Sequence, residues 1–396
     1  MLTGKTIVLG VTGSIAAYKT ANLASMLVKL NADVHVIMTQ NATHFITPMT
    51  FETLTNNKCI VDTFDRNFNF DVKHVSLAKQ GDLFLVAPCT ANVIGKVAGG
   101  ICDDMLTTTI MATKAPVLFS PAMNTGMWEN PILQDNIQKL KHYGYHIIEP
   151  VEGRLACGDI GSGKMPSEEV LIEHVLLHLA KYKDLKGKKI LVTAGPTQEA
   201  IDPVRYITNH SSGKMGYAIA KMAVLRGAEV TLVSGPVSLQ PFAGIDTVPV
   251  VSATDMFEAV TPRSADQDVI IMCSAVADYT PVHYSDQKVK KQDGDLSIAL
   301  TRTHDILAWL GAEKKKKGQI LVGFSMETEN LIENSREKLA KKHADLICAN
   351  SISDNQTGFA VDTNQVTLIT QAGVVELPLC SKEETANLIL DHINSL

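Results

Sequence analysis

The feature that most constrains the fold is a pattern that occurs twice: a short apolar strand, a glycine turn, and the start of a helix. The first copy is Lys5-Thr-Ile-Val-Leu-Gly-Val-Thr-Gly-Ser-Ile-Ala-Ala17. The second is Lys188-Lys-Ile-Leu-Val-Thr-Ala-Gly-Pro-Thr197, which continues through Asn209-His-Ser-Ser-Gly-Lys-Met-Gly216. Short, continuous apolar strands are typical of a parallel sheet that is buried on both faces. The chain of 396 residues is long enough for two cores, so we expect two nucleotide-binding α/β domains in series.

Composition excludes several classes of function. The net charge of −6 gives no indication of a nucleic-acid surface. No apolar run approaches the roughly 20 residues that span a bilayer, so we expect no membrane partner. The seven cysteines are scattered and form no CxxC pair, which argues against a disulfide framework or a zinc site. This cysteine usage is typical of a reducing compartment, and we expect a cytoplasmic protein.

The first half begins with one βαβ unit: strand 7–11, helix 15–30 and strand 33–38. Its glycine loop, Gly10-x-x-Gly13-Ser14, would turn backbone N–H groups and a helix N-terminus toward a phosphate. The loop is not GxGxxG, and Thr39 stands where a dinucleotide fold has a ribose-binding carboxylate. The pattern therefore disfavours NAD and favours a mononucleotide such as FMN.

Two further strand ends carry polar residues. The strand 82–88 is followed by Cys89-Thr-Ala-Asn92 at a helix start, where Thr90 and Asn92 are equally typical of N-caps. The strand 116–120 runs into Pro121-Ala-Met-Asn-Thr-Gly-Met-Trp128, whose amide, Asn124, is either a turn residue or a ligand contact. Loops at these carboxyl ends are where open α/β sheets bind ligands.

A glycine-rich segment follows the strand 145–149. Gly153-Arg-Leu-Ala-Cys-Gly-Asp-Ile-Gly-Ser-Gly-Lys164 predicts a mobile flap that carries Cys157, for which a core position is the alternative. The segment copies most of a P-loop, but Met165 replaces the magnesium-binding hydroxyl and Pro166 follows, so we reject that motif. His74, at the start of an expected helix, is either structural or catalytic. We place the first domain at 1–180, a polar linker at 181–189 and the second domain at 190–396.

The second half has its own candidate sites. Ser211, Ser212 and Gly213 open a helix and would cradle a polyphosphate. Asp278 follows the strand 269–274 and is either a helix cap or a magnesium ligand. The lysines of Lys288-Val-Lys-Lys291 form either a solvated face or a phosphate clamp. Lys338 and Lys342 are four residues apart, so they share a helical face and can reach one anion.

Four motifs of the first half together resemble the flavin-containing cysteine decarboxylase family: Gly13-Ser-Ile-Ala-Ala-Tyr-Lys19, the His74 segment, Pro121-Ala-Met-Asn124 and Ala156-Cys-Gly-Asp159. With the second domain attached, the whole chain is similar to bacterial bifunctional phosphopantothenoylcysteine decarboxylase/phosphopantothenate–cysteine ligases of coenzyme A synthesis. The resemblance implies a flavodoxin-like first domain and a Rossmann-like second domain.

The resemblance also implies roles for residues of the first half. His74 would assist oxidation and decarboxylation, Asn124 would hold the substrate carboxylate, and Cys157 would donate a proton from the closing flap. Substrate would also contact Met123. The residues that would contact FMN are Gly13, Ser14, Ile15, Thr39, Thr90 and Asn92.

For the second half, the resemblance implies CTP-dependent acyl transfer with Mg²⁺. Lys288 would stabilise the charged transition state, Asn209 would act on the acyl-cytidylate, and Asp278 would bind the metal. The residues that would bind substrate or nucleotide are Ser211, Ser212, Gly213, Ala275, Asp278, Lys288, His304, Asp305, Ile306, Leu307, Phe324, Lys338 and Lys342. His304 replaces a more usual proline, and Ser325-Met326 replaces small alanines, which bears on the preference for CTP.

The expected activity is the synthesis of 4′-phosphopantetheine from 4′-phosphopantothenate, cysteine and CTP. A homo-oligomer is implied by the resemblance, with a trimer-based decarboxylase core and dimerising ligase domains. Two alternatives remain at this point: a two-domain NAD(P) oxidoreductase, and a flavodoxin-like electron carrier or regulatory flavin-binding subunit fused to a nucleotide sensor. The first is disfavoured by Thr39 and the missing GxGxxG, and the second by the combination of His74, Asn124 and Cys157.

Overall fold

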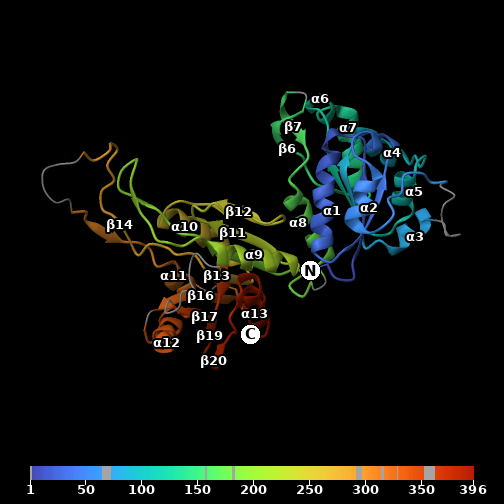
Figure 1. Ribbon diagram of the computed structural model, residues 1–396. Helices are drawn as coiled ribbons and strands as arrows, with labels where there is room; N and C mark the ends of the chain where they lie inside the picture. Colours follow the sequence, from blue (N-terminus) through green and yellow to red (C-terminus); the bar gives the residue numbers. More distant parts are fainter. Residues whose placement is uncertain are drawn as a thin grey trace. The chain divides into compact units, whose positions relative to one another are not determined.

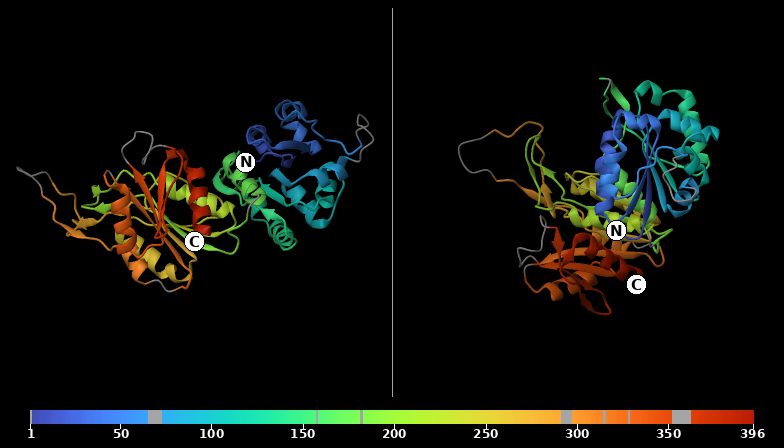
Figure 2. Two further views of the ribbon diagram at one scale, coloured as in Figure 1. Left: turned by 90° about the horizontal axis from the view of Figure 1, so that it is seen from below. Right: turned by 45° about the vertical axis from the view of Figure 1, so that its right-hand side comes forward.

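The computed structural model describes residues 2–64, 73–156, 158–180, 183–290, 297–313, 316–327, 329–351 and 362–396. The chain separates into two compact units, Met1–Ala180 and Lys181–Leu396 (Figures 1 and 2). No helix in the described part of the chain is long and apolar enough to cross a membrane.

The N-terminal unit is built on a parallel five-stranded sheet in the order β2-β1-β3-β4-β5. The strands are β1 (Thr6–Val11), β2 (Asp33–Met38), β3 (Leu83–Cys89), β4 (Val117–Pro121) and β5 (His146–Ile147). Every residue of β3 and β4 is buried, as expected for a sheet with helices on both faces. This order is the flavodoxin-like doubly wound order, so the predicted fold class of this half is confirmed.

Helices cover both faces of this sheet (Figure 1). They are η1 (Ile15–Tyr18), α1 (Lys19–Lys29), η2 (Gln40–His44), α2 (Pro48–Thr55), α3 (Lys73–Gln80), α4 (Ala91–Gly99), α5 (Met105–Ala112), α6 (Thr125–Trp128), α7 (Pro131–His142) and α8 (Glu168–Leu179). Apolar residues of α4, α5 and α7 share one core with Val8, Phe84 and Phe119 of the sheet. Helices α1 and α8 pack against each other, and α8 also contacts β3.

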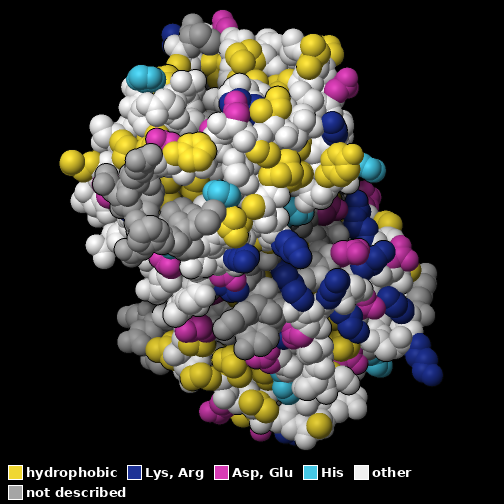
Figure 3. All heavy atoms as spheres, turned by 90° about the vertical axis from the view of Figure 1, so that its right-hand side faces the viewer, with side chains coloured by type: hydrophobic (Ala, Val, Ile, Leu, Met, Phe, Trp, Pro, Cys, Tyr) yellow, Lys and Arg dark blue, Asp and Glu magenta, His cyan; other side chains and the backbone are white. Residues whose placement is uncertain are grey.

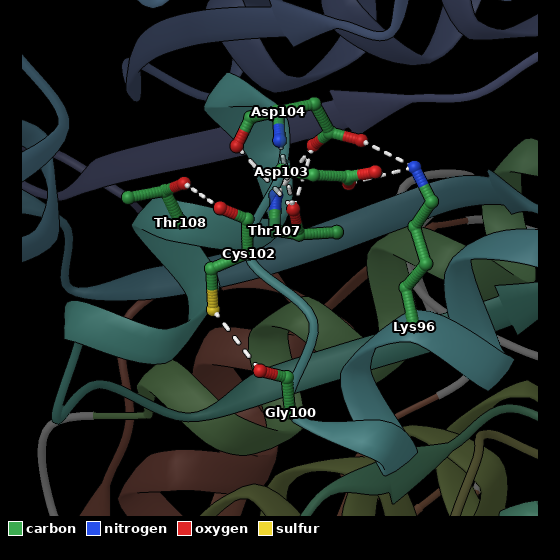
Figure 4. Close-up of polar contacts among 7 residues, drawn as sticks. All are labelled: Lys96, Gly100, Cys102, Asp103, Asp104, Thr107 and Thr108. Carbon is green, nitrogen blue, oxygen red and sulfur yellow. Dashed lines mark hydrogen bonds and ion pairs between the residues drawn. The ribbon is translucent and has the colours of Figure 1, made fainter.

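The connection from α4 to α5 is held by side chains (Figure 4). Lys96 of α4 pairs with Asp103 at 2.7 Å and with Asp104 at 3.4 Å. Asp104 begins α5 through a reciprocal capping box with Thr107, which satisfies N–H groups that the first turn of a helix leaves unpaired. The ion pairs and the capping box therefore fix the start of α5 relative to the end of α4.

The segment predicted as a flap is an antiparallel β-hairpin of β6 (Val151–Arg154) and β7 (Ile160–Lys164). The high glycine content suggested a loop, but two of the glycines are there for close packing. A Cβ atom on Gly161 would lie 2.7 Å from Thr125 Oγ1, and one on Gly163 would collide with the Met123 carbonyl oxygen. Gly163 also has a φ of +127°, which side chains rarely allow.

The C-terminal unit contains an eight-stranded sheet in the order β12-β11-β8-β13-β16-β17-β19-β20. Its first six strands are parallel, and the last two form an antiparallel edge. The strands are β8 (Lys189–Ala194), β11 (Glu229–Ser234), β12 (Asp246–Pro249), β13 (Val269–Met272), β16 (Ile320–Glu327), β17 (Leu346–Ser351), β19 (Val366–Ile369) and β20 (Val374–Glu376). The parallel part has the Rossmann order 3-2-1-4-5-6, which confirms the predicted class of this half.

Two helical layers enclose this sheet. The helices are α9 (Lys214–Leu225), α10 (Ala253–Val260), η3 (Thr261–Asp266), α11 (Ile306–Ala312), α12 (Leu331–Lys341) and α13 (Lys382–Asn394). Helices α10, α11 and α12 contribute to one core with Leu191, Ile270 and Leu321, whereas α9 and α13 pack against each other. The connecting segments of this unit contain three two-stranded sheets. They pair β9 (Glu199–Ala200) with β10 (Tyr206–Ile207), β14 (Tyr279–Pro281) with β15 (Leu300–Arg302), and β18 (Thr363–Asn364) with β21 (Cys380–Ser381).

The segment predicted as a linker, 181–189, is largely part of the second unit. Leu185 is buried, and its N–H group donates to the carbonyl of Arg226 at the end of α9. Asp184 pairs with the Arg226 guanidinium, and Lys183 Nζ donates to the carbonyl of Leu225. Lys189 is the first residue of β8. The segment is polar in composition, so the sequence did not indicate that one of its residues, Leu185, is buried in the second unit.

Candidate functional sites

In the N-terminal unit, a cavity of about 630 Å³ lies beside the carboxyl ends of β1 and β4. It brings together four of the predicted residues, Ser14, Ile15, Met123 and Asn124, with Ala156 from the hairpin. Ser14 caps η1 by accepting the N–H of Ala16 at 3.3 Å. The cavity therefore gathers the first glycine turn, the loop after β4 and the hairpin at one edge of the sheet.

Asn124 has partners on both sides of its amide. Its Oδ1 accepts the N–H of Gly126 at 2.8 Å and caps α6, and its Nδ2 donates to Asp159 Oδ2 at 2.9 Å. The N–H of Met123 donates to the carbonyl of Gly163 at 3.0 Å. Asn124 can therefore be both a turn residue and a ligand contact. Its capping bond to α6 fixes the orientation of its side-chain amide, and that amide lines the cavity. Cys157, predicted as the proton donor, lies outside the described residues.

The remaining predicted flavin contacts do not line this cavity but adjoin its strands. Gly13 packs so closely on the segment after β2 that an added Cβ would lie 2.6 Å from Asn41 Cβ. Thr39, which follows β2, has a buried hydroxyl with no hydrogen-bond partner in the described structure. Thr90 occupies the N-cap position of α4 without a side-chain capping bond, and Asn92 is exposed in the first turn. The N-cap prediction therefore holds for the position of Thr90, although its hydroxyl makes no capping bond, and it is wrong for Asn92.

A buried threonine that sequence reasoning missed joins two of these strand ends. Thr12 is fully buried, and its hydroxyl donates to the carbonyl of Pro88 at 2.7 Å and accepts the N–H of Thr90 at 3.0 Å. These bonds connect the ends of β1 and β3, the two strands at which the strand order of the sheet reverses. Ligands bind at this switch point in doubly wound folds. The only sequence signal was a hydroxyl within the glycine loop.

The residues around the switch point fit a flavin mononucleotide. The buried Thr39 hydroxyl, which has no partner among the described residues, and the capping Ser14 provide polar contacts for a phosphate. The adjoining cavity provides space for a ring. His74 lies in the first turn of α3, which packs against α5, and it does not line the cavity.

In the C-terminal unit, two adjoining cavities open at the carboxyl ends of the parallel strands. The larger, about 440 Å³, is lined by predicted nucleotide contacts: Asp278, His304, Asp305, Ile306, Leu307, Phe324, Lys338 and Lys342. The smaller, about 280 Å³, is lined by Ser211, Ser212, Gly213 and Ala275 together with Asp278, Phe324 and Lys338. Three predicted residues, Asp278, Phe324 and Lys338, therefore line both cavities and mark where they meet.

Charged residues of the larger cavity restrain one another. Lys338 donates to the carbonyl of Phe324 at 2.8 Å, and burial lowers the pKa of its ammonium group. Asp305 caps α11 by accepting the N–H of Ala308 and also pairs with Lys342. His304 stacks on Phe257, with ring centroids 4.5 Å apart and an interplanar angle of 22°. Ile306 and Leu307 are mainly core residues.

Asn209 connects two predicted substrate segments. Its Nδ2 donates to the carbonyl of Ala275 at 2.6 Å, and its Oδ1 accepts the N–H of Ser211 at 2.9 Å. The helix start at α9 is thereby linked to the loop after β13. Gly213 is the N-cap of α9 with a φ of +77°, and its N-terminal position there suits an anion.

Asp278 is exposed and lines both cavities. It precedes strand β14 rather than a helix, so the prediction that it caps a helix is wrong. No group of three or more His, Cys, Asp or Glu side chains among the described residues is arranged to hold a metal. A single carboxylate is compatible with Mg²⁺, which retains waters and binds through one or two carboxylates plus substrate phosphates.

Lys288 is exposed and lines neither cavity, but an ion pair with a buried carboxylate holds its neighbour. Asp202 is buried and pairs with Arg205 at 2.6 Å, and it accepts the N–H of Val289 at 3.1 Å. Arg205 donates to the carbonyl of Val289 at 3.0 Å. The Arg205 guanidinium, followed by backbone N–H groups, holds the pKa of the Asp202 carboxyl well below its usual range. The sequence analysis did not predict this connection to the Lys288 segment, because it joins residues far apart in the chain.

Comparisons with known proteins agree with this two-part architecture. The family model described as "Flavoprotein" matches residues 1–179, and the model described as "DNA/pantothenate metabolism flavoprotein C-terminal domain" matches residues 185–396.

Relatives match the whole chain. The coenzyme A biosynthesis bifunctional protein CoaBC of Bacillus subtilis (strain 168) is 48% identical over 400 residues, covering 100% of this chain and 98% of that protein. The protein of the same name from Escherichia coli (strain K12) is 43% identical over 395 residues, covering 99% of this chain and 97% of that protein. A crystal structure of the C-terminal domain of a CoaBC protein is 48% identical and covers 54% of this chain and 97% of that chain, with a TM-score of 0.47. The chain therefore belongs to the family of bifunctional coenzyme A biosynthesis proteins called CoaBC.

Proposed function

We propose that this enzyme makes 4′-phosphopantetheine in two reactions, one in each unit. The C-terminal unit joins cysteine to 4′-phosphopantothenate with CTP, and the N-terminal unit decarboxylates the product. The observation that carries this proposal is the full-length similarity to CoaBC proteins. The two units each supply a cavity at the ligand-binding edge of a doubly wound sheet, which supports a separate reaction in each.

Ligation requires a leaving group on the carboxylate of 4′-phosphopantothenate. That carboxylate attacks the α-phosphorus of CTP, pyrophosphate leaves, and an acyl-cytidylate forms. The amine of cysteine then attacks the acyl carbon and CMP departs. Lys288 stabilises negative charge in the transition state, and Asn209 acts on the acyl-cytidylate. Asp278 would hold Mg²⁺, which would neutralise phosphate charge. Lys338 and Lys342, which line the larger cavity, contact the nucleotide.

Decarboxylation needs an electron sink beside the cysteine carboxylate. FMN, when bound, supplies that sink by reversibly oxidising the thiol carbon, with no net redox change over the reaction. Asn124, which lines the cavity, holds the carboxylate through its amide. His74 moves a proton during oxidation, and Cys157 returns a proton to the product carbon. Gly13, Ser14, Ile15, Thr39, Thr90 and Asn92 hold the cofactor.

Three of the proposed catalytic residues, His74, Asn209 and Lys288, line none of the cavities described above. We therefore propose a homo-oligomer in which a second copy completes each site, as the flavin sites of the resembled family lie at subunit contacts. Hydrophobic side chains are spread over the face of the N-terminal unit in the upper part of Figure 3. Exposed examples in this unit include Met49, Ile101 and Met111. Free thiols at the six described cysteines are consistent with a reducing cytoplasm.

The first test is the visible spectrum of the purified protein, followed by chromatography of the heat-released cofactor. Release of about one FMN per chain is the expected result. Protein supplied with 4′-phosphopantothenate, cysteine, CTP and Mg²⁺ should then release pyrophosphate, CMP and CO₂. A colourless protein that takes up no added FMN would exclude the decarboxylase half. A bound nicotinamide nucleotide would instead support the oxidoreductase alternative.

A further inference from the structure

The side-chain amide of Asn124, which the proposed decarboxylation uses to hold the substrate carboxylate, is bonded to a carboxylate of the chain itself. Its Nδ2 donates to Asp159 Oδ2 at 2.9 Å. Its Oδ1 accepts the N–H of Gly126 at 2.8 Å and caps α6, so the amide cannot be reversed without loss of that cap. The NH₂ group is therefore the end that meets a carboxylate, whether the carboxylate comes from Asp159 or from a substrate.

Asp159 is placed by the tip of the hairpin, between β6 and β7. The N–H of Leu155 donates to the carbonyl of Asp159 at 2.8 Å, and the N–H of Gly158 donates to the carbonyl of Leu155 at 3.0 Å. Both bonds are local to the tip. The backbone of the tip thus sets where the Asp159 side chain leaves the chain, and its carboxylate joins Asn124 across 35 positions of the sequence.

The tip of the hairpin is packed less tightly than β7. In β7, the carbonyl of Gly163 accepts the N–H of Met123 at 3.0 Å, and an added Cβ on Gly163 would collide with the Met123 carbonyl oxygen. At the tip, Asp159 is exposed, Ile160 is 82% exposed, and a Cβ on Gly158 would meet no atom within 4 Å. Segments with few buried contacts rearrange at low cost. The Asp159 carboxylate can therefore leave the amide while β7 stays attached.

The charges at the adjoining cavity favour a carboxylate at this amide. The described residues that line the cavity include Lys19, Arg154 and Lys164 and no carboxylate. Asp159 belongs to the hairpin and does not line the cavity. If a substrate carboxylate were bonded to the same NH₂ group, two negative charges would lie side by side, and like charges at that range repel. The substrate carboxylate and the Asp159 carboxylate therefore compete for Asn124.

We propose that Asp159 is a positioning residue that acts through Asn124, as an internal competitor of the substrate carboxylate. The inference rests on the proposed decarboxylase activity. The substrate displaces Asp159 from the amide, and this exchange lowers the apparent affinity for the substrate, because only the fraction of the enzyme with a released amide can bind its carboxylate. Once CO₂ has left, the product has no carboxylate, and Asp159 returns to Asn124. The affinity for the product therefore does not depend on Asp159.

The test is a titration of the full-length, FMN-loaded enzyme with two ligands, followed through the flavin absorption band so that only the N-terminal site is measured. One ligand is 4′-phosphopantothenoylserine, which has the carboxylate but no thiol to oxidise. The other is 4′-phosphopantetheine, which has no carboxylate. In Asp159→Asn, the Kd for the serine analogue should fall about threefold to tenfold, because a neutral amide competes for Asn124 less strongly than a charged carboxylate. The Kd for 4′-phosphopantetheine should stay within about twofold of the wild type.

Glu152→Gln is the matched control. Glu152 is exposed in β6 of the same hairpin and does not line the cavity, so this variant removes an equal charge while leaving the bond between Asp159 and Asn124 in place. Its Kd values for both ligands should match those of the wild type. Asp159→Ala is a second variant, which removes the hydrogen bond as well as the charge. It should strengthen binding of the serine analogue at least as much as Asp159→Asn does.

Four results overturn the inference. They are an unchanged Kd for the serine analogue in both Asp159 variants, an equal gain in affinity for both ligands, an equal gain in Glu152→Gln, and weaker binding of the serine analogue. The last result would show that Asp159 supports the amide rather than competing for it. A wild-type enzyme that takes up no FMN, or that releases no CO₂ from 4′-phosphopantothenoylcysteine, would instead contradict the proposed function, so the two failures are distinguishable.

Discussion

The two units begin alike but build their ligand edges differently. In the N-terminal unit, β1 passes through a tight turn at Gly13 directly into η1, and the hydroxyl of Thr12 joins that turn to the end of β3. In the C-terminal unit, a long connection containing β9 and β10 separates β8 from α9. It is held by the ion pair between the buried Asp202 and the partly exposed Arg205.

The difference in connection length goes with a difference in cavity chemistry. The cavity beside the short turn combines the Ser14 hydroxyl and the Asn124 amide with the basic residues Lys19, Arg154 and Lys164, and the described residues that line it include no carboxylate. The long connection allows lysines and a carboxylate from several elements to surround the helix start, suited to phosphates and a metal. A common local start is therefore compatible with two different reactions, because the surrounding segments supply the chemistry.

The largest expected effect tests whether the units work independently. Lys288→Gln should lower ligation about 10²- to 10³-fold, because a positioned cation that stabilises developing charge is lost. The flavin spectrum and CO₂ release from supplied 4′-phosphopantothenoylcysteine should be unchanged. Lys316→Gln, which removes an exposed ion pair with Asp268, is the matched lysine control. Normal ligation by a folded Lys288→Gln enzyme would refute the proposed mechanism.

The reciprocal change is Asn124→Asp. It should lower decarboxylation about 10²-fold, because a carboxylate would repel both the substrate carboxylate and its partner Asp159. Ligation, measured as pyrophosphate release, should keep its wild-type rate. Asn130→Asp, in the residue that caps α7, is the control for a charge at a helix start. If the control lost equal activity, helix capping rather than substrate contact would explain the effect.

A smaller effect concerns the long connection of the C-terminal unit. Asp202→Asn removes the charge that pairs with Arg205 and weakens the restraint on the Lys288 segment. Ligation should fall about tenfold to a hundredfold, as expected for misplaced catalytic groups. Lys288→Gln combined with Asp202→Asn should be no worse than Lys288→Gln alone. Additive losses would show that Asp202 acts elsewhere.

The same carboxyl gives a pH dependence with a defined sign. Its pKa is depressed in the folded chain, so its stabilising contribution is present above the unfolded value of about 3.9. That contribution is lost as the pH falls from about 4 toward the lower folded pKa. In thermal melts over this range, the wild type should lose stability more steeply than Asp202→Asn. Parallel curves for the two proteins would contradict the assignment.

Local sequence patterns predicted much of the fold and of the candidate sites in both units. The features that they did not predict depend on contacts between residues far apart in the chain. Continuous apolar runs predicted the parallel strands, and polar residues at their carboxyl ends predicted where ligands bind. The hairpin at 151–164 was not predicted. Its glycines are needed for close packing on Thr125 and Met123, but in the sequence they cannot be distinguished from glycines that make a segment flexible. The Thr12–Thr90 and Asp202–Val289 hydrogen bonds join residues 78 and 87 positions apart, which no local pattern encodes.

The smallest expected effect concerns the nucleotide. His304→Ala removes the stacking on Phe257, and an aromatic pair of this kind contributes about 0.5–1.5 kcal/mol. The KM for CTP should change by no more than about tenfold, with decarboxylation unaffected. A larger change, or a new preference among nucleoside triphosphates, would show that His304 contacts the base itself.

The burial of Leu185 determines where this polypeptide can be divided. A separately produced C-terminal half that begins at Lys189 would lose Leu185 and leave the nearly buried Arg226 without Asp184, although Asp391 would still pair with it. A half that begins at Lys183 keeps all of these contacts. In exchanges of halves between relatives, the seam that preserves both cores therefore falls between Ala180 and Lys183, several residues before the second sheet starts.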